Sequence, residues 1–262
     1  MRTSFGGTSI YSVQYMNNQE STKNQRKIPR MDVLIFTGGT SPDPSLLALF
    51  FDKLFKPDYI IAADSGLDAL SRYDAFFGSS FAPNLILGDM DSLEDTSLLV
   101  RYDTAERETF FSDKDFTDSE LALMRARGIA GDGRVAVLGG CGGRADHFIA
   151  LYDSFSRGYH ADIWLCQTQT AVFLTEGRTL DVRSLAQDDV LSVARLTREY
   201  ASSVLEATGL EWTGFAKCGM ASISNRISHE AFSSGKGVQL FAKKGSFLVF
   251  LPQTALFTVS GT

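Results

Sequence analysis

The chain has 262 residues, of which 44% are hydrophobic and 21% are charged, so it can fold as one or two globular domains with a sizeable core. Its net charge of −6 does not favour a nucleic-acid partner, because phosphates repel an acidic surface. No run of about 18 apolar residues is present, so we expect no membrane span. Three dispersed cysteines predict neither a disulfide framework nor a zinc site and fit a reducing, cytoplasmic location.

Residues 1–30 are rich in Ser, Thr, Asn and Gln and contain one acidic residue, Glu20. They lack the continuous apolar core of a secretory signal. We expect a disordered extension, or sequence upstream of a start near Met31. An organelle transit peptide is the alternative that the composition leaves open.

From residue 31 to residue 168, short apolar runs alternate with segments of helical periodicity. This alternation predicts a Rossmann-like α/β domain, with a mostly parallel sheet covered by helices. The expected strands are 33–36, 59–63, 85–87, 109–111, 135–138 and 162–166. The expected helices are 44–56, a short one that ends near Tyr73, one that begins after the capping box of Thr117 and Glu120, and 147–155.

Beyond about Gln167 the pattern changes to short strand-like runs broken by turn residues. The expected strands are 171–174, 190–196, 202–206, 238–242 and 247–250. Because helical periodicity is hard to find in this region, we expect a second, all-β domain over residues 169–262. A jelly-roll-like sandwich or a small barrel would account for it.

Acidic residues follow the expected strands where each strand ends, which is where open α/β sheets bind ligands. Asp89 and Asp91 lie two apart in an extended segment, so both side chains can point toward one cation. Mg²⁺ prefers such oxygen ligands. Two aspartates that cap a turn are the structural alternative. Ser92 and Asp95 also fit a capping box, which predicts a helix directly after the pair.

The segment Lys114-Asp115-Phe116-Thr117-Asp118 places a lysine and two carboxylates at the N-terminus of an expected helix. The positive end of a helix favours anions, and Lys114 can meet a phosphate as a point charge. A well-capped surface helix explains the same residues as completely.

Four glycines precede Arg144 in the run Gly139-Gly140-Cys141-Gly142-Gly143-Arg144-Ala145-Asp146-His147. Glycines let a backbone approach a ligand closely, and Arg144 offers a fork that matches phosphate and that Asp146 can orient. His147 is either a proton carrier or, as we favour, a hydrogen-bond partner at the helix start. The run is neither a Walker A loop nor a dinucleotide-binding fingerprint.

In the expected β domain, Trp212 follows Gly209-Leu210-Glu211, and Ser222, Ser224 and Asn225 come soon after. The ring of Trp212 can stack on a flat, cationic heterocycle. The two serines and Asn225 can hydrogen-bond to an aminopyrimidine. A core tryptophan and a Ser-Asn turn are the structural alternative.

The order of these motifs resembles that of the thiamine pyrophosphokinase family over roughly residues 32–250. The motifs are Asp64-Ser65-Gly66, Gly88-Asp89-Met90-Asp91-Ser92, Lys114-Asp115-Phe116-Thr117-Asp118, Gly142-Gly143-Arg144-Ala145-Asp146-His147, Gly209-Leu210-Glu211-Trp212 and Ser224-Asn225. The resemblance implies an α/β domain followed by a β-sandwich. It also implies a homodimer, with thiamine held between the α/β domain of one subunit and the sandwich of the other.

The resemblance also implies roles for individual residues. Mg²⁺ would be held by Asp89, Asp91 and Asp118, with Asp64 and Asp115 nearby. Lys114 and Arg144 would face the phosphates of ATP. The wider nucleotide site would comprise Gly38, Gly39, Asp64, Ser65, Gly66, Lys114, Arg144, Asp146 and His147, and the thiamine site Trp212, Ser222, Ser224 and Asn225. Which aspartate, if any, accepts the hydroxyl proton stays open.

The implied reaction is transfer of a diphosphate from Mg²⁺-bound ATP to the hydroxyl of thiamine, with release of AMP. A Mg²⁺-dependent phosphohydrolase, or a non-catalytic sensor of nucleotide or thiamine diphosphate, would use the same residues. Two positions depart from the family pattern. Leu151 stands where the family usually has Asn, and the C-terminal stretch 246–250 lacks the Trp of eukaryotic members, which indicates a bacterial-type member.

Overall fold

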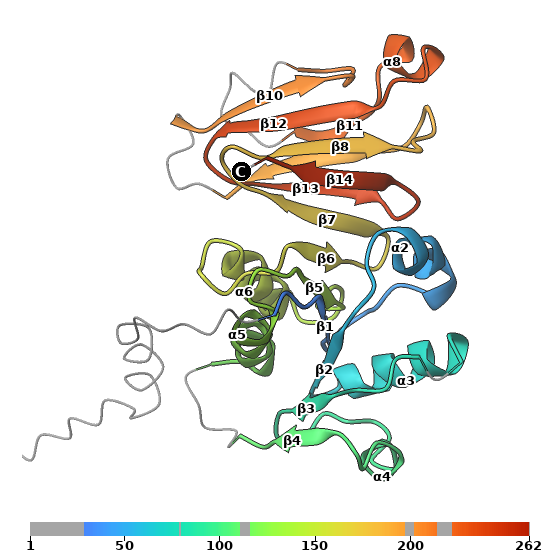
Figure 1. The fold of residues 1–262 in the computed structure, drawn as a ribbon, viewed down its shortest axis with the longest axis vertical. Helices are drawn as coiled ribbons and strands as arrows, with labels where there is room; N and C mark the ends of the chain where they lie inside the picture. The colour runs from blue at the N-terminus through green and yellow to red at the C-terminus, as the bar shows by residue number, and fades with distance from the viewer. Residues whose placement is uncertain (1–28, 79, 111–115, 197–201, 214–221, 262) are drawn as a thin grey trace, which may run out of the picture.

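The computed structural model describes residues 29–78, 80–110, 116–196, 202–213 and 222–261, and their strands form two sheets (Figure 1). The large sheet has ten strands in the order β11-β9-β13-β7-β6-β5-β1-β2-β3-β4, and the small sheet has four in the order β10-β12-β8-β14. The large sheet consists of β1 (Val33–Phe36), β2 (Tyr59–Ala63), β3 (Leu85–Leu87), β4 (Glu106–Glu108), β5 (Val135–Leu138), β6 (Ile163–Leu165), β7 (Gln169–Leu174), β9 (Leu191–Arg195), β11 (Ser222–Asn225) and β13 (Phe247–Pro252). The small sheet consists of β8 (Thr179–Arg183), β10 (Val204–Thr208), β12 (Val238–Lys244) and β14 (Leu256–Ser260).

Strands β4, β3, β2, β1, β5 and β6 pair in parallel, and helices cover both faces of this part of the sheet (Figure 1). Every residue of β1, β3 and β5 is buried, which is why these strands read as continuous apolar runs. One face carries η1 (Pro44–Leu47), α2 (Ala48–Lys53) and α3 (Gly66–Phe76). The other carries α5 (Asp118–Ala130) and α6 (Ala145–Ser154). Helix α4 (Leu98–Arg101) precedes the edge strand β4.

The two faces of β1 belong to two different hydrophobic cores. Leu34 and Phe36 pack in the core on the α3 side, whereas Val33 and Ile35 pack with α5 and α6. This division follows from the alternation of side chains along a strand. The core on the α3 side continues into the space between the large and small sheets.

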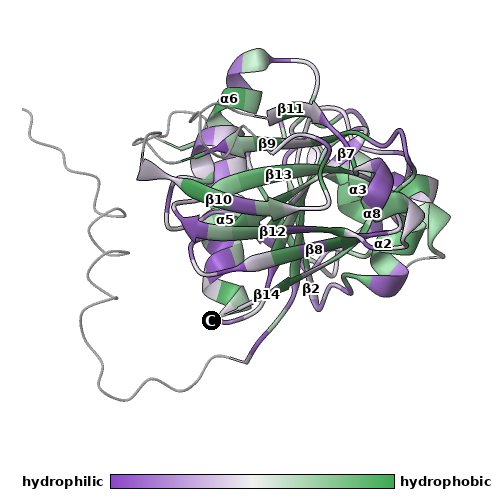
Figure 2. Cartoon of the chain, turned by 90° about the horizontal axis from the view of Figure 1, so that it is seen from above, coloured by the Kyte–Doolittle hydropathy of each residue, from purple (hydrophilic) through white to green (hydrophobic). Residues whose placement is uncertain are grey.

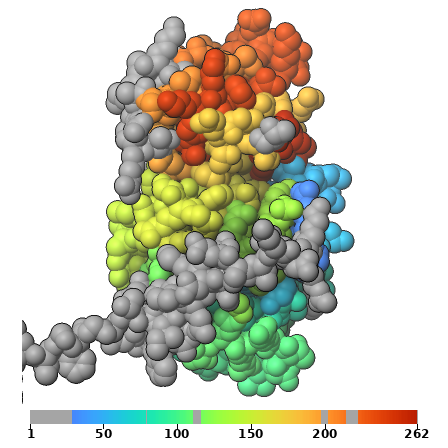
Figure 3. All heavy atoms as spheres, turned by 60° about the vertical axis from the view of Figure 1, so that its left-hand side comes forward, coloured from blue at the N-terminus to red at the C-terminus, as the bar shows by residue number. Residues whose placement is uncertain are grey.

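The large sheet runs without a break from its parallel half into an antiparallel half. Strand β6 pairs antiparallel with β7, and the N–H of Cys166 donates to the carbonyl of Gln169 at 2.9 Å to close the turn between them. Figure 2 shows the small sheet beside β9, β11 and β13, and Figure 3 shows the chain filling space from its green segments at one end to its red segments at the other. The predicted fold class is confirmed, while a domain boundary at residues 168/169 stays a prediction.

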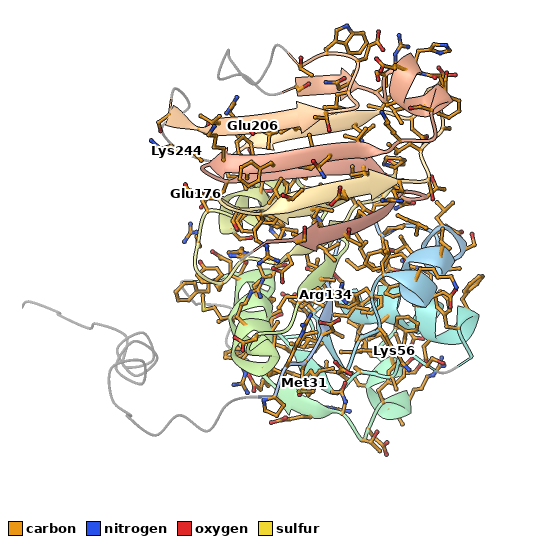
Figure 4. All side chains as sticks on the ribbon, turned by 45° about the horizontal axis from the view of Figure 1, so that its top comes forward. Met31, Lys56, Arg134, Glu176, Glu206 and Lys244 are labelled. Atoms are coloured by element: carbon orange, nitrogen blue, oxygen red, sulfur yellow. The ribbon has the colours of Figure 1, made fainter. Side chains whose placement is uncertain are left out.

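The outer face of the small sheet is polar. Lys243 pairs with Glu206 at 2.8 Å across β12 and β10, and Gln239 donates to Asp181 at 2.9 Å across β12 and β8. Figure 4 shows Glu206 on this sheet, at the far end of the molecule from Met31. Short helix α8 (His229–Ser233) lies beside the sheet, and no helix among the described residues has the length and apolarity to cross a membrane.

Three predictions about local structure are wrong. The fourth strand is Glu106–Glu108 rather than 109–111, because this edge strand carries charged side chains and the apolar signal came from Phe110, which packs against the α5 side core. Ser92 and Asp95 do not start a helix; α4 begins at Leu98, and Asp95 instead accepts the N–H of Ser97 at 2.9 Å. Residues 44–56 form a 3₁₀ turn before a short α-helix rather than one helix.

Candidate active site

Three of the acidic residues singled out in the sequence meet at the carboxyl ends of β2 and β3. Asp64 directly follows β2, and Asp89 and Asp91 lie in the loop after β3. Carboxylate oxygens of the three residues lie within 4.8 Å of one another. They come together because β2 and β3 are parallel neighbours, so their carboxyl ends share one edge of the sheet. We call Asp64, Asp89 and Asp91 the acidic cluster.

Asp64 is held in place by its backbone at the end of β2. Its backbone has a φ of 48°, and its N–H donates to the carbonyl of Leu87 at 2.8 Å, which fixes the start of its side chain beside β3. Its Oδ1 atom is buried and has no hydrogen-bond partner among the described residues. Burial raises the pKa of the Asp64 carboxyl, hydrogen bonds from the Ser65 N–H and the Ser92 hydroxyl oppose this shift, and the nearby carboxylates of Asp118 and Asp91 add to it.

These features fit a divalent cation. A buried carboxylate oxygen without a partner is costly, and a bound cation would compensate it. The acidic cluster offers the hard oxygen ligands that Mg²⁺ prefers, and Mg²⁺ commonly takes one or two protein carboxylates together with substrate phosphates. The donor set therefore matches a Mg²⁺ site that would be completed by phosphate oxygens and water.

Asp118 lies next to the acidic cluster but outside its 4.8 Å group. It is the first residue of α5, whose capping box joins Thr117 and Glu120, as the sequence predicts. Gly88 has a φ of 132°, and a Cβ at this position would lie 3.3 Å from Asp118 Oδ1 and 3.3 Å from Asp64 Cβ. Gly88 therefore allows the β3 end to pass between two carboxylates.

Lys114 and Asp115 lie outside the described residues, so the positions predicted for them stay predictions. The same holds for the phosphate contact expected of Lys114.

The loops after β1 and β5 lie against each other beside the acidic cluster. The N–H of Gly140 donates to the carbonyl of Gly38 at 2.7 Å, and the N–H of Thr40 donates to the carbonyl of Cys141 at 2.5 Å. The indole N–H of Trp164, a buried residue of β6, donates to the carbonyl of Gly139 at 2.8 Å. These contacts fix the backbone of two glycine-containing loops along one edge of the sheet.

The start of α3 packs against the loop after β1. A Cβ on Gly66 would overlap the carbonyl of Phe36, so only glycine permits this approach. A Cβ on Gly38 would meet the hydroxyl of Ser65. Gly38, Ser65 and Gly66 therefore lie side by side, next to Asp64.

The exposed N-terminus of α6 carries the charged residues of the glycine-rich motif. Arg144 precedes the helix, and its guanidinium makes two contacts with Asp146, at 2.6 and 3.2 Å. This pairing lowers the pKa of Asp146 to about 2. His147 is exposed on the same turn. Leu151 is buried, and its side chain would collide with a Cβ on Gly140, so it fills the space beneath the glycine-rich loop.

Three of the four candidate thiamine residues, Trp212, Ser222 and Asn225, form one hydrogen-bonded unit. Trp212 is 51% exposed, and the guanidinium of Arg226 lies 5.2 Å from the centroid of its ring. Asn225 is buried, donates to the carbonyl of Trp212 at 2.7 Å and accepts its N–H at 3.3 Å. Asn225 also donates to the hydroxyl of the buried Ser222 at 3.1 Å. Ser224 is exposed, with a φ of 58°.

One polar contact near the acidic cluster carries no signal in the sequence. The hydroxyls of Thr37, at the end of β1, and Ser119, in the first turn of α5, lie 2.6 Å apart. The contact ties the helix that begins with Asp118 to the central strand. Because the two residues are 82 positions apart in the chain, only the fold reveals it.

Comparison with known proteins gives the following matches. Residues 51–166 match the family model described as thiamin pyrophosphokinase, catalytic domain. The fold is similar to that of a thiamin pyrophosphokinase family protein from Enterococcus faecalis, with 18% identity, a TM-score of 0.63, and coverage of 86% of this chain and 99% of that one.

Two further solved structures share the fold. Thiamin pyrophosphokinase from Candida albicans has 16% identity, a TM-score of 0.61, and coverage of 84% of this chain and 90% of its own. Thiamine pyrophosphokinase from Bacillus subtilis has 19% identity, a TM-score of 0.61, and coverage of 84% and 98%. At these identities the likeness establishes the fold alone. A comparison with curated protein sequences gives no match.

Proposed function

We propose that this member of the thiamin pyrophosphokinase family transfers a diphosphate group from Mg²⁺-bound ATP to the hydroxyl of thiamine, with thiamine diphosphate and AMP as products. The family match over residues 51–166 confirms the resemblance that the motifs indicate. The observation that carries the proposal is the acidic cluster, whose three carboxylates lie within 4.8 Å of one another. The Oδ1 of Asp64, which has no partner among the residues that the structure describes, supports a cation at this place.

The proposed reaction is an in-line displacement. The thiamine hydroxyl gives its proton to one of the aspartates and its oxygen forms a bond to the β-phosphorus of ATP. The bond from that phosphorus to the oxygen bridging to the α-phosphorus breaks, and AMP leaves with that oxygen. A Mg²⁺ ion held by Asp64, Asp89 and Asp91 would neutralise charge on the phosphate oxygens. Lys114 and Arg144 would add positive charge at the phosphates. The loops after β1 and β5 would accept the nucleotide close to their backbone.

For thiamine, we assign the exposed ring of Trp212 as the stacking surface, because an aromatic face attracts a flat cationic ring. Both polar atoms of the Asn225 amide bond to the backbone of Trp212, so we assign Asn225 to holding Trp212 rather than to a direct contact with thiamine. Ser224 is exposed and is the better candidate for a direct hydrogen bond.

The sheet order supports a site shared between two copies of the chain. Strand β11, which carries Ser224, is first in the large sheet, and β2, which leads to Asp64, is eighth. At about 4.8 Å per strand, seven steps across the sheet correspond to roughly 34 Å, far more than one thiamine molecule can bridge. We therefore propose a homodimer in which Trp212 of one copy faces the acidic cluster of the other.

The experiment that tests the activity is incubation of the protein with ATP, Mg²⁺ and thiamine, followed by mass spectrometry of the products. We expect equimolar thiamine diphosphate and AMP that require all three additions. ATP breakdown without thiamine would instead indicate a phosphohydrolase. Binding of ATP or thiamine diphosphate without release of AMP would indicate a sensor.

The shared site is tested by unfolding and refolding together two variants that we expect to be inactive on their own, Asp89→Ala and Trp212→Ala. In a statistical mixture half of the dimers are mixed, and each mixed dimer regains one intact site, so we expect about a quarter of the wild-type activity. If each site used one chain only, the mixture would stay as inactive as its components.

A further inference from the structure

Asp68 makes a contact that neither the motifs nor the proposed reaction assigns a purpose. It lies in the first turn of α3, four residues after Asp64. Its Oδ2 accepts the N–H of Glu94 at 3.0 Å, and its Oδ1 accepts the N–H of Asp95 at 3.2 Å. One carboxylate thus holds two consecutive backbone amides of a loop that lies 26 and 27 residues further along the chain.

The loop that Asp68 holds is the one that carries Asp89 and Asp91. Between the end of β3 and the start of α4, residues 88–97 contain no helix or strand. The near end of the loop is tied by the N–H of Gly88, which donates to the carbonyl of Glu108 at 3.1 Å. Further on, Leu93 is buried in the core on the α3 side. The contacts of Asp68 follow Leu93 directly and close the loop against α3.

We propose that Asp68 is a positioning residue for the metal centre, because it fixes the loop so that Asp89 and Asp91 reach Asp64. The segment that runs from the end of β2 into α3 contributes to both sides of this arrangement, since Asp64 belongs to the acidic cluster and Asp68 anchors the loop that supplies its other two members. Hydrogen bonds from backbone amides to an ionised carboxylate are strong ones, which suits this purpose. The consequence for catalysis rests on the proposed function, whereas the consequence for metal binding does not.

A structural role offers a different explanation of Asp68. An acidic residue in the first turn stabilises a helix through the helix dipole. In that case its loss would weaken α3 and leave the geometry of the acidic cluster unchanged. The two explanations predict different metal affinities for a variant that lacks the Asp68 carboxylate. They also predict that different backbone amides of that variant become open to hydrogen exchange.

The test measures binding of Mn²⁺ alone, without nucleotide, to the full chain by electron paramagnetic resonance. We expect Asp68→Ala to weaken Mn²⁺ binding by about 10- to 100-fold, the usual effect of removing a group that orients metal ligands. Asp68→Asn should recover part of the affinity, because its amide oxygen still accepts one of the two N–H groups. Asp189→Ala is the matched control: Asp189 accepts the N–H of Ala186 at 2.7 Å in the antiparallel half, and its loss should leave the affinity unchanged.

Hydrogen exchange supplies a second readout that does not depend on activity. In Asp68→Ala the amides of residues 88–97 should exchange faster, while those in the centre of α3 keep their rate. Uniformly faster exchange across α3, or a Mn²⁺ affinity equal to that of Asp189→Ala, would overturn the positioning role. Absence of Mn²⁺ binding by the wild-type chain would overturn it as well.

The outcome is separable from that of the proposed function. Loss of Mn²⁺ affinity in Asp68→Ala, in a chain that forms no thiamine diphosphate, would leave the positioning role standing and remove the proposed reaction. Formation of thiamine diphosphate by the wild type, with unchanged Mn²⁺ affinity in Asp68→Ala, would support the proposed reaction and remove the positioning role.

Discussion

The two halves of the large sheet treat their buried polar groups in opposite ways. In the parallel half, Asp64 Oδ1 is buried, has no hydrogen-bond partner in the described part of the chain, and lies among other carboxylates. In the antiparallel half, the buried amide of Asn225 bonds to Trp212, Ser222 and the N–H of Arg226, the last at 2.9 Å. The parallel half thus leaves a buried polar atom unsatisfied where we propose a cation, whereas the antiparallel half holds one exposed ring with a satisfied hydrogen-bond network.

The largest expected effect is on kcat and comes from a substitution in the parallel half. Asp89→Ala should lower kcat by about 10³-fold or more, because charge on the transferred phosphate would lose its cation. The fold should persist, since Asp89 lies in a loop at the sheet edge. The measurement is AMP release under saturating thiamine, with circular dichroism to check the fold.

Asp153→Ala serves as the control for this variant, because Asp153 pairs with Arg157 on the surface at 2.7 Å and should be dispensable. Near-normal turnover of Asp89→Ala would remove Asp89 from the site.

In the antiparallel half we predict a smaller effect, on stability and on the KM for thiamine. Asn225→Ala should destabilise the protein by about 1–3 kcal/mol, because it removes the partners of the part-buried N–H and carbonyl of Trp212. It should also raise KM for thiamine more than it lowers kcat, since Trp212 loses its fixed position. Urea unfolding and steady-state kinetics measure the two effects.

Ser224→Ala provides the comparison, because Ser224 is exposed and its removal should raise KM for thiamine without a loss of stability. Equal stability of Asn225→Ala and Ser224→Ala would contradict the view that the Asn225 network is a support.

Asp64→Asn tests the contrast between the two halves of the large sheet by its effect on the free energy of unfolding. In metal-free buffer the neutral amide removes the cost of a buried charge among carboxylates, so we expect a gain of about 0.5–2 kcal/mol, as at other strained functional sites. Added Mg²⁺ should raise the melting temperature of the wild type and not that of the variant. A less stable Asp64→Asn in metal-free buffer would show that Asp64 supports the fold instead.

The smallest effect concerns His160, next to β6 where the two halves meet. Burial lowers the pKa of His160, with Arg127 lowering it further and Asp162 and the carbonyl of Ala161 opposing the shift. Because the unfolded chain takes up the proton first, the free energy of unfolding should fall as pH drops below about 6.5 and approaches the folded pKa. This component should be present in full above pH 6.5.

His160→Gln should remove this pH-dependent component, and urea unfolding at pH 7.5 and 5.5 measures it. An unchanged difference between the two pH values in the variant would assign the dependence to other groups.

The sequence predicts the parallel half better than the antiparallel half. Strands β1, β2, β3 and β5 lie at their predicted positions, because buried parallel strands are continuous apolar runs bounded by turn residues. Strands β8, β11 and β14 were missed, since each is short and only partly buried. The continuity of the large sheet through β6 and β7 depends on pairing between strands, which periodicity does not encode.

For the site, the order of motifs brings Asp64, Asp89 and Asp91 to the strand ends but does not determine which carboxylates meet. The resemblance favours Asp118 as the third ligand, whereas the geometry groups Asp64 with Asp89 and Asp91. The contact of Asp68 cannot be predicted from the sequence, because its partners are backbone amides, which almost every residue type supplies.

Diffraction from crystals grown with Mn²⁺ tests the central proposition most directly, since anomalous scattering locates the ion independently of any assay. We predict one strong peak at the ends of β2 and β3, within bonding distance of carboxylate oxygens of Asp64, Asp89 and Asp91. A peak bound elsewhere, with these three carboxylates bare at Mn²⁺ concentrations that support turnover, would contradict the account.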